Sequence, residues 1–141
     1  MPIRKILVGH DESPPADRAL ALAADLAEEY DARLVLLTVL PPLPSVAPDT
    51  ASISDVTRAR IDTALRMLRQ RAERLRTEGR SVGHLVEIGD PTERLLDLAD
   101  RLEVDVTVLG RSGKGAVARL LMGSVTTSLL HQSKRPILVV P

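Results

Sequence analysis

Four short runs of nearly uninterrupted Val, Ile and Leu constrain the fold of this 141-residue chain more than any other feature. They cover residues 3–9, 33–40, 104–109 and 136–140, and a weaker run with polar members covers residues 82–88. Strands with one solvated face alternate apolar and polar residues, whereas strands covered on both faces are apolar throughout. The runs therefore predict a parallel sheet between two helical layers, with residues 82–88 at an edge.

Helical patterns separate these runs. Their apolar residues recur at spacings of three and four, and Ser13, Gly79 and the segment Asp90-Pro91 supply start and stop signals. We expect helices over about residues 14–30, 61–75, 90–102 and 123–132. The proline-rich stretch 41–54 is expected to be a loop. With right-handed crossovers, this β-α alternation predicts one domain over residues 1–141, a doubly wound, three-layer α/β/α sandwich.

Composition excludes several classes of function. The chain has no Phe, Trp or Cys, its one aromatic residue is Tyr30, and its formal net charge is zero. Stacking on nucleic-acid bases, a general attraction for nucleic acid or acidic membranes, disulfides and thiolate chemistry are therefore not expected. No apolar segment approaches the ~18 residues of a membrane span, and the first residues do not resemble a signal sequence. We expect a cytoplasmic protein.

A glycine pattern follows the fourth run: Gly110, Gly113, Gly123 and Ser124. A strand that leads into glycines and then into a helix start gathers exposed backbone N–H groups, an arrangement suited to phosphates. Glycine would let the backbone approach phosphates closely or adopt positive φ. This pattern favours a nucleotide-binding site. The alternative is that the glycines only permit turns and Ser124 is an ordinary N-cap.

The charge distribution supports the same interpretation. No acidic residue follows Asp105, and the basic residues of that part are Arg111, Lys114, Arg119, Lys134 and Arg135. A small basic pocket attracts a polyanionic small molecule even when the whole chain is neutral. The alternative is that these residues are solvated charges on loops and helix ends.

Two better-known phosphate motifs do not fit this segment. A P-loop requires Gly-Lys followed by Ser or Thr, whereas Gly115 follows Lys114. A dinucleotide fingerprint requires an acidic residue ~20 positions downstream, and no acidic residue follows. We therefore do not expect a P-loop NTPase or a nicotinamide dehydrogenase.

The end of the first strand carries the other unusual residues, from Gly9 to Ser13. In doubly wound folds ligands bind where the strand order reverses, so we expect this segment to adjoin the glycine pattern. Asp11 either binds a ribose hydroxyl, an adenine amino group or a divalent ion, or caps the following turn. The histidines His10, His84 and His131 show no zinc-site spacing and are expected to be structural or exposed. No nucleophile with a His–acid relay is evident.

The segment from Val8 to Ser13, the second-strand residues Leu36 to Val39 and the spacing Gly110-x2-Gly113-x9-Gly123-Ser124 resemble the universal stress protein family. The resemblance extends over essentially the whole chain, including Asp90-Pro91 and the final segment 135–140. The glycine pattern is similar to that of the ATP-binding branch. The resemblance implies a Rossmann-like, adenine nucleotide alpha hydrolase-like fold with five parallel strands in the order 3-2-1-4-5.

The resemblance also implies site residues. Gly9, Asp11 and Val39 would surround adenine and ribose, with His10 beside them. The ribose and phosphates would lie against Gly110, Arg111, Gly113, Lys114, Gly123, Ser124, Val125 and Thr126. It implies ATP as the ligand, with Mg²⁺ or Mn²⁺ held through the phosphates and no metal site made by the protein alone. It further implies a homodimer paired through Ile137, Leu138, Val139 and Val140.

Two positions differ from the common family pattern. Position 12 is often Gly or another uncharged residue, whereas Glu12 here would weaken phosphate binding or favour a bridging Mg²⁺; Thr38 replaces a frequent His. The leading expectation is an ATP-binding regulatory or stress-response protein with at most slow hydrolysis or autophosphorylation. The alternatives are an adenine-nucleotide hydrolase using Asp11 or Ser124, and a binding module for AMP or cyclic AMP.

Overall fold

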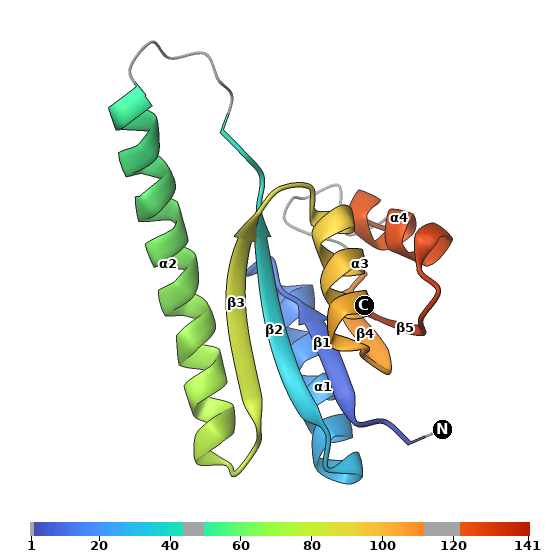
Figure 1. Ribbon diagram of the computed structural model, residues 1–141. Helices are drawn as coiled ribbons and strands as arrows, with labels where there is room; N and C mark the ends of the chain where they lie inside the picture. Colours follow the sequence, from blue (N-terminus) through green and yellow to red (C-terminus); the bar gives the residue numbers. More distant parts are fainter. Residues whose placement is uncertain (1, 44–49, 112–121) are drawn as a thin grey trace.

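The computed structural model describes residues 2–43, 50–111 and 122–141 (Figure 1). Strands and helices alternate strictly through these residues. Their order is β1 (Lys5–Gly9), α1 (Pro14–Tyr30), β2 (Arg33–Leu40), α2 (Thr50–Thr77), β3 (Val82–Ile88), α3 (Pro91–Leu102), β4 (Val106–Gly110), α4 (Ser124–Gln132) and β5 (Ile137–Val140).

The strands form one parallel sheet in the order β3-β2-β1-β4-β5. Helices α1 and α2 supply the apolar cluster on one face, and α3 and α4 supply the cluster on the other. The predicted three-layer sandwich and strand order are confirmed, as is the edge position of β3. The strand order reverses between β1 and β4, so the carboxyl ends of these two strands border the expected crevice.

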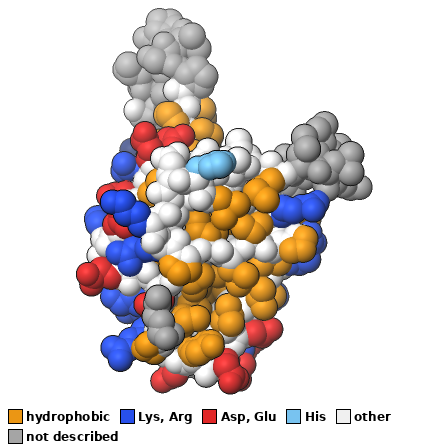
Figure 2. Space-filling view, turned by 90° about the vertical axis from the view of Figure 1, so that its right-hand side faces the viewer, with side chains coloured by type: hydrophobic (Ala, Val, Ile, Leu, Met, Phe, Trp, Pro, Cys, Tyr) orange, Lys and Arg blue, Asp and Glu red, His pale blue; other side chains and the backbone are white. Residues whose placement is uncertain are grey.

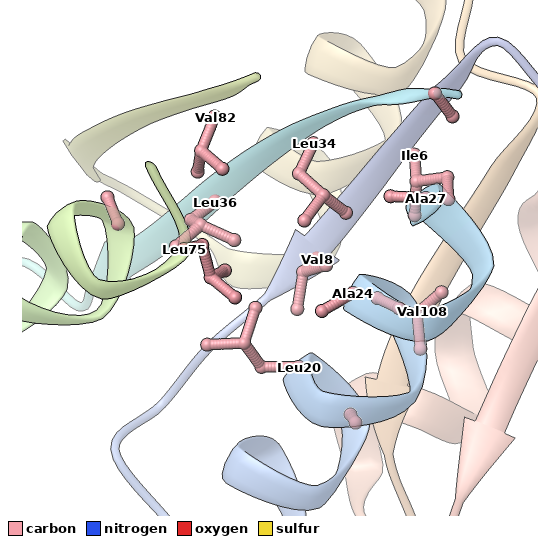
Figure 3. Close-up of a cluster of buried hydrophobic side chains, with 14 of the residues drawn as sticks. Ile6, Val8, Leu20, Ala24, Ala27, Leu34, Leu36, Leu75, Val82 and Val108 are labelled. Carbon is pink, nitrogen blue, oxygen red and sulfur yellow. The ribbon is translucent and has the colours of Figure 1, made fainter. Parts of the chain in front are cut away.

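Alternating strand residues build the two cores. Ile6 and Val8 pack with Leu34 and Leu36 against α1 and α2 (Figure 3). Leu7, between them in β1, lies in the cluster on the opposite face of the sheet. Each of these side chains is fully buried. Burial of one such side chain stabilises the fold by about 1.5–3 kcal/mol. The demand for apolar side chains on both faces explains why the strands read as continuous apolar runs.

Local signals set most helix ends. Ser13 caps α1 by accepting from the Ala16 N–H at 3.3 Å, and Asp90 caps α3 by accepting from the Glu93 N–H at 2.9 Å. A proline occupies the first position of each helix, where its missing N–H removes no intrahelical bond. Gly79 follows α2 with φ 87°, a conformation that suits glycine, which confirms the predicted stop.

The prediction of a loop over residues 41–54 is partly wrong, because α2 already begins at Thr50. The four prolines of this stretch all precede residue 49, and no Pro or Gly follows before Gly79. Once a helix is nucleated, each further residue adds a hydrogen bond, so the helix extends beyond its packed apolar stripe. Smaller differences concern strands: β1 begins at Lys5, β4 covers Val106–Gly110, and β5 begins at Ile137.

Candidate functional site

A cavity of about 320 Å³ lies at the carboxyl ends of β1 and β4, where the strand order reverses. Its lining comes from five parts of the fold: the end of β1 with the β1–α1 turn, the end of β2, the amino-terminal half of α3, the end of β4, and the start of α4 with its N-cap. The lining residues are Gly9, His10, Asp11, Ser13, Leu37, Val39, Pro91, Leu95, Leu109, Gly110, Gly123, Ser124, Val125 and Thr126.

Most predicted site residues that the structure describes meet in this cavity. The expectation that the two strand ends adjoin is therefore confirmed. Arg111 follows the lining residue Gly110 but is not part of the lining. Gly113 and Lys114 lie outside the described residues. Sequence reasoning did not assign Leu37, Pro91, Leu95 and Leu109 to the site, although Leu37 shares its sheet face with Val39 and Leu109 precedes Gly110.

The walls near the sheet are apolar. Leu95 and Leu109 are buried, and with Leu37 and Val39 they belong to the cluster between the sheet and helices α3 and α4. A Cβ atom on Gly9 would lie 2.6 Å from Leu109 Cδ2 and 3.2 Å from Leu95 Cδ2. Glycine at position 9 therefore leaves room for both leucines, which give the cavity an apolar wall that an aromatic base could contact.

Gly110 lines the cavity and also lets two elements pack closely. Its φ is not positive, so the left-handed conformation offered as one reason for glycine is absent here. A Cβ atom at this position would lie 2.8 Å from the carbonyl carbon of Pro15 and 3.0 Å from the Ala16 nitrogen. The structure thus shows a close approach between β4 and the first turn of α1, and the approach of this glycine to a phosphate stays a prediction. Glycine is required at this position because backbone atoms of α1 occupy the space of a side chain.

The amino terminus of α4 points its first N–H groups toward the same region. Gly123 is the N-cap, with φ −63° and ψ 155°, and Ser124 is the first helical residue, so Ser124 is not the cap. The first N–H groups of an α-helix have no carbonyl partner within the helix, and the helix dipole favours negative charge there. Because residues 123–126 line the cavity, this end can stabilise an anion.

Three hydrogen bonds fix this terminus to the sheet. The Thr126 hydroxyl donates to the Gly110 carbonyl at 2.9 Å, and the Gly123 N–H donates to the Arg111 carbonyl at 2.8 Å. The Arg111 N–H in turn donates to the Val140 carbonyl at 2.7 Å. These bonds tie the start of α4 to the carboxyl ends of β4 and β5.

Asp11 lies at the mouth of the cavity and is exposed. Its Oδ1 accepts hydrogen bonds from the Ser13 N–H, at 3.0 Å, and from the Ser13 hydroxyl. The turn-capping role that the sequence left open is thus present. A carboxylate has two oxygens, each with two lone pairs, so capping by Oδ1 leaves capacity to accept from a ligand hydroxyl or amino group.

His10 contributes to the cavity wall, but its ring faces the protein. The side chain is 0% exposed; Nε2 lies 2.8 Å from Asp17 Oδ1, and Nδ1 accepts from the Glu12 N–H at 3.0 Å. Since Nδ1 accepts, we assign the proton of the neutral ring to Nε2. Burial lowers the pKa of His10 below its usual value of 6.5, which the opposing hydrogen bond to Asp17 does not reverse. The structural role expected for this histidine is confirmed.

The hydrogen bond from the Glu12 N–H to His10 Nδ1 stabilises an unfavourable backbone conformation at Glu12. Glu12 has φ 68°, in the left-handed region, where a residue other than glycine costs about 1–2 kcal/mol. A hydrogen bond contributes a net stabilisation of about 0.5–1.5 kcal/mol. The imidazole therefore offsets much of the strain at Glu12.

Charge is distributed unevenly around the site. Asp11 is the one ionised side chain among the described lining residues, and Arg111 follows directly on the lining. Arg135 lies elsewhere: it donates to Asp100 Oδ1 at 3.1 Å and to the Val104 carbonyl at 3.0 Å. Arg135 is therefore neither part of the lining nor a fully solvated charge, because it is paired within the protein. Lys114 and Arg119 lie outside the described residues.

The groups that line the cavity determine which metal ions or small molecules it could bind. In residues 2–43, 50–111 and 122–141, no three His, Asp or Glu side chains gather as metal ligands. Apolar side chains, a carboxylate and a helix amino terminus line one cavity, a combination suited to the base, ribose and phosphate of a nucleotide. In the described part of the chain, none of the helices combines the length and apolarity needed to span a bilayer.

Comparisons with known proteins agree with this geometry. The model of the universal stress protein family matches residues 2–141. A universal stress protein of Mycolicibacterium smegmatis is 30% identical over 96% of this chain, which spans 47% of that protein. The structure of UspA from Lactobacillus plantarum superimposes with a TM-score of 0.90 at 25% identity, over 100% of this chain and 99% of that one.

A further solved structure contains a ligand. It is a universal stress protein in complex with cAMP, 25% identical, with a TM-score of 0.74 over 99% of this chain and 98% of that one. The solved structures thus agree with the fold described above, and the family model matches nearly the whole chain. The chain belongs to the universal stress protein family.

Proposed function

We propose that the cavity binds an adenine nucleotide, and that the protein is a cytosolic, nucleotide-dependent regulatory or stress-response factor with ATP as its ligand. The observation that supports this most directly is that the α4 amino terminus and the apolar residues Leu95 and Leu109 line the same cavity. The base would lie against these leucines near Gly9 and Val39, and the phosphates would extend toward residues 123–126.

The residues present fit such a ligand. The Asp11 carboxylate is placed to accept from the ribose hydroxyls or the adenine amino group, and Mg²⁺ or Mn²⁺ would be held through the phosphates. No described group acts as a base toward an attacking water, so hydrolysis or autophosphorylation, where present, is slow.

A second candidate, a binding module for AMP or cyclic AMP, is favoured by two observations. A relative at 25% identity was solved with cAMP, and the cavity mouth carries the negative charge of Asp11, followed by Glu12. Each added phosphate raises the repulsion from these carboxylates unless a divalent ion bridges them.

Calorimetric titration with ATP, ADP, AMP and cyclic AMP, each with and without Mg²⁺, tests the function and ranks the ligands. Ser124→Asp places a negative charge in the first turn of α4, which favours the helix but repels a phosphate. We expect its affinity to fall about tenfold or more, equivalent to ~1.4 kcal/mol. The isosteric, uncharged Ser124→Asn is the control and should bind nearly as wild type. Absence of binding by the wild type at millimolar nucleotide would refute the proposal.

The homodimer is proposed from the free edge of β5. The carbonyls of Pro136 and Val140 accept from β4, so by alternation the N–H and C=O groups of Ile137 and Val139 point to the open edge. Figure 2 faces the side where α4 and β5 lie in Figure 1, and apolar side chains gather there. A second copy of this strand would satisfy the edge groups and cover part of that surface.

A further inference from the structure

Three side chains from different elements form a continuous chain of contacts behind the cavity. Arg71 of α2 donates to Asp17 of α1, with Nε 2.8 Å from Oδ1 and a second nitrogen 3.4 Å from Oδ2. Asp17 Oδ1 also accepts from His10 Nε2 at 2.8 Å. His10 Nδ1 accepts a hydrogen bond from the Glu12 N–H. The chain therefore runs from α2, across α1, to the turn that borders the site.

The contacts fix the ring of His10 in one orientation and one tautomer. The hydrogen bond from Arg71 lowers the pKa of Asp17, so its carboxylate remains an acceptor near neutral pH. An anionic acceptor at Nε2 requires the proton to lie there, and this leaves Nδ1 free to accept from Glu12.

Two hydrogen bonds to β2 also fix the backbone of His10. Its N–H donates to the Leu37 carbonyl at 2.9 Å, and its carbonyl accepts from the Thr38 hydroxyl at 2.8 Å. The β1–α1 turn is thus tied to β2 through the backbone of His10 and to α1 and α2 through its ring. Gly9, His10, Asp11 and Ser13, all of this turn, line the cavity.

We propose that His10, Asp17 and Arg71 are positioning residues for nucleotide binding: they hold the β1–α1 turn in the left-handed form that presents Asp11 to the ligand. This inference rests on the proposed function. None of the three side chains needs to contact the nucleotide, and Asp17 and Arg71 are not part of the lining.

Protonation of His10 provides a signature specific to this role. A proton added at Nδ1 would point at the Glu12 N–H, and the acceptor that stabilises the turn would be lost. The charged groups that face the ring are Asp17 of α1, Asp11 of the turn and Arg71 of α2. The affinity for nucleotide should therefore fall as the pH decreases through the pKa of His10, which lies below 6.5.

Two substitutions of His10 separate the two ring nitrogens. His10→Asn retains an acceptor near the place of Nδ1 but does not reach Asp17, whereas His10→Gln reaches Asp17 and loses the acceptor. We expect His10→Gln and Asp17→Asn to weaken ATP binding about tenfold, the upper end of what the loss of one hydrogen bond costs. His10→Asn, which retains the acceptor for the Glu12 N–H, should lose about threefold or less, the lower end of that range.

A matched control lies at the other end of α1. Glu28 accepts from Arg80 at 3.0 Å, an ion pair between α1 and the segment after α2 that is remote from the lining. Glu28→Gln removes a comparable ion pair and should leave the dissociation constant for ATP unchanged. Arg71→Gln should act in the same direction as Asp17→Asn.

The dissociation constants are measured over pH 5–7.5, and each variant is divided by wild type at the same pH, which cancels the titration of ATP itself. Near neutral pH, the dissociation constant of His10→Asn should exceed that of wild type. At low pH the ratio should fall to one or below, because protonation of His10 weakens binding by wild type and the variant cannot be protonated at this position. Amide exchange of Glu12, followed by NMR without nucleotide, should accelerate in His10→Gln and Asp17→Asn.

The outcomes are distinguishable. Wild-type affinity in both His10→Gln and Asp17→Asn, or a ratio for His10→Asn that does not change with pH, would overturn the positioning role while leaving the proposed function intact. A wild type that binds none of the nucleotides would overturn the proposed function and, with it, this role. Asp17 is half-exposed and Asn has the same shape, so Asp17→Asn is expected to fold.

Discussion

The hydroxyl of Thr126 donates a hydrogen bond to the carbonyl of Gly110 at 2.9 Å, although the two residues lie on different elements and 16 positions apart. Thr126 is buried, in the first turn of α4, and Gly110 is the last residue of β4. Together with the bond from the Gly123 N–H to the Arg111 carbonyl, it fixes the amino terminus of α4 against the end of β4, which lines the cavity.

Thr126→Val keeps the shape of this side chain but removes the donor. We expect the free energy of unfolding to fall by about 1 kcal/mol, because a buried carbonyl loses its partner. Nucleotide affinity should also fall, since the helix end is less fixed. Thr127→Val is the control: Thr127 is exposed, and its hydroxyl donates within the helix terminus to the Gly123 carbonyl. Chemical denaturation and calorimetry measure both effects, and equal losses in the two variants would contradict the prediction.

Glu12→Gly should stabilise the fold, because glycine adopts φ 68° without the side-chain cost that Glu12 bears. The expected gain in the free energy of unfolding is about 1 kcal/mol. It should also strengthen ATP binding in the absence of Mg²⁺ by removing a negative charge near the site.

Asp31→Gly is the matched control for this substitution. Asp31 has φ 54° at the end of α1, away from the lining residues. It should show a similar gain in thermal stability with no change in affinity. A destabilised Glu12→Gly would mean that other contacts of the Glu12 side chain outweigh the backbone strain.

Gly110→Ala should destabilise the protein by about 1–3 kcal/mol, because its new methyl group would overlap backbone atoms of Pro15 that cannot rotate away. Gly83→Ala in β3 is the control, since the nearest atom to its methyl group would be the end of Arg33 at 3.5 Å. Thermal unfolding compares the two. A Gly110→Ala protein as stable as wild type would show that α1 can move off β4 at little cost.

Stability should decrease as the pH falls below 6.5. The pKa of His10 is lower in the folded state than in the unfolded chain, so the unfolded chain binds a proton first, and the free energy of unfolding falls until the pH passes the folded pKa. His84, whose pKa is lowered by burial and by Arg76, acts in the same direction. Asp17 adds a further loss only below its usual pKa of 3.8.

Urea unfolding at several pH values between about 5 and 7.5 measures this slope. His10→Asn should reduce it and leave the part due to His84. An unchanged slope in His10→Asn would show that His10 takes up its proton equally in both states.

Val139→Pro should dissociate the proposed dimer while leaving the subunit folded. The N–H of Val139 points to the open edge of β5, so its loss removes no bond to β4, and proline is tolerated at sheet edges. Leu138→Pro is the comparison, since its N–H faces β4 and its loss should destabilise the subunit itself. Light scattering gives the mass of each variant; a Val139→Pro dimer would argue for a different interface.

Some elements of the fold and the site could be predicted from the sequence, and others could not. The apolar runs of β1, β2 and β4 predicted the buried parallel sheet because a strand covered on both faces leaves no place for a polar residue. The beginning of α2 was missed because the sequence shows no clear apolar stripe before Ile61, and the neighbouring prolines suggested a longer loop. Residues 54–60 are exposed or half-buried. Leu95 and Leu109 were missed because a leucine in a ligand wall has the same sequence pattern as a leucine in the core.

The α/β class, the meeting of the β1 and β4 ends and the anion-favouring start of α4 could be predicted, because they depend on hydrophobic period, glycine and capping signals within short segments. The packing of Gly110 against Pro15 and the orientation of the His10 ring by Asp17 and Arg71 became visible in the folded chain alone. Residues 10 and 71 are linked through Asp17 because α1 and α2 pack on the same face of the sheet. Such contacts depend on the angles and distances between packed elements, which no local pattern encodes.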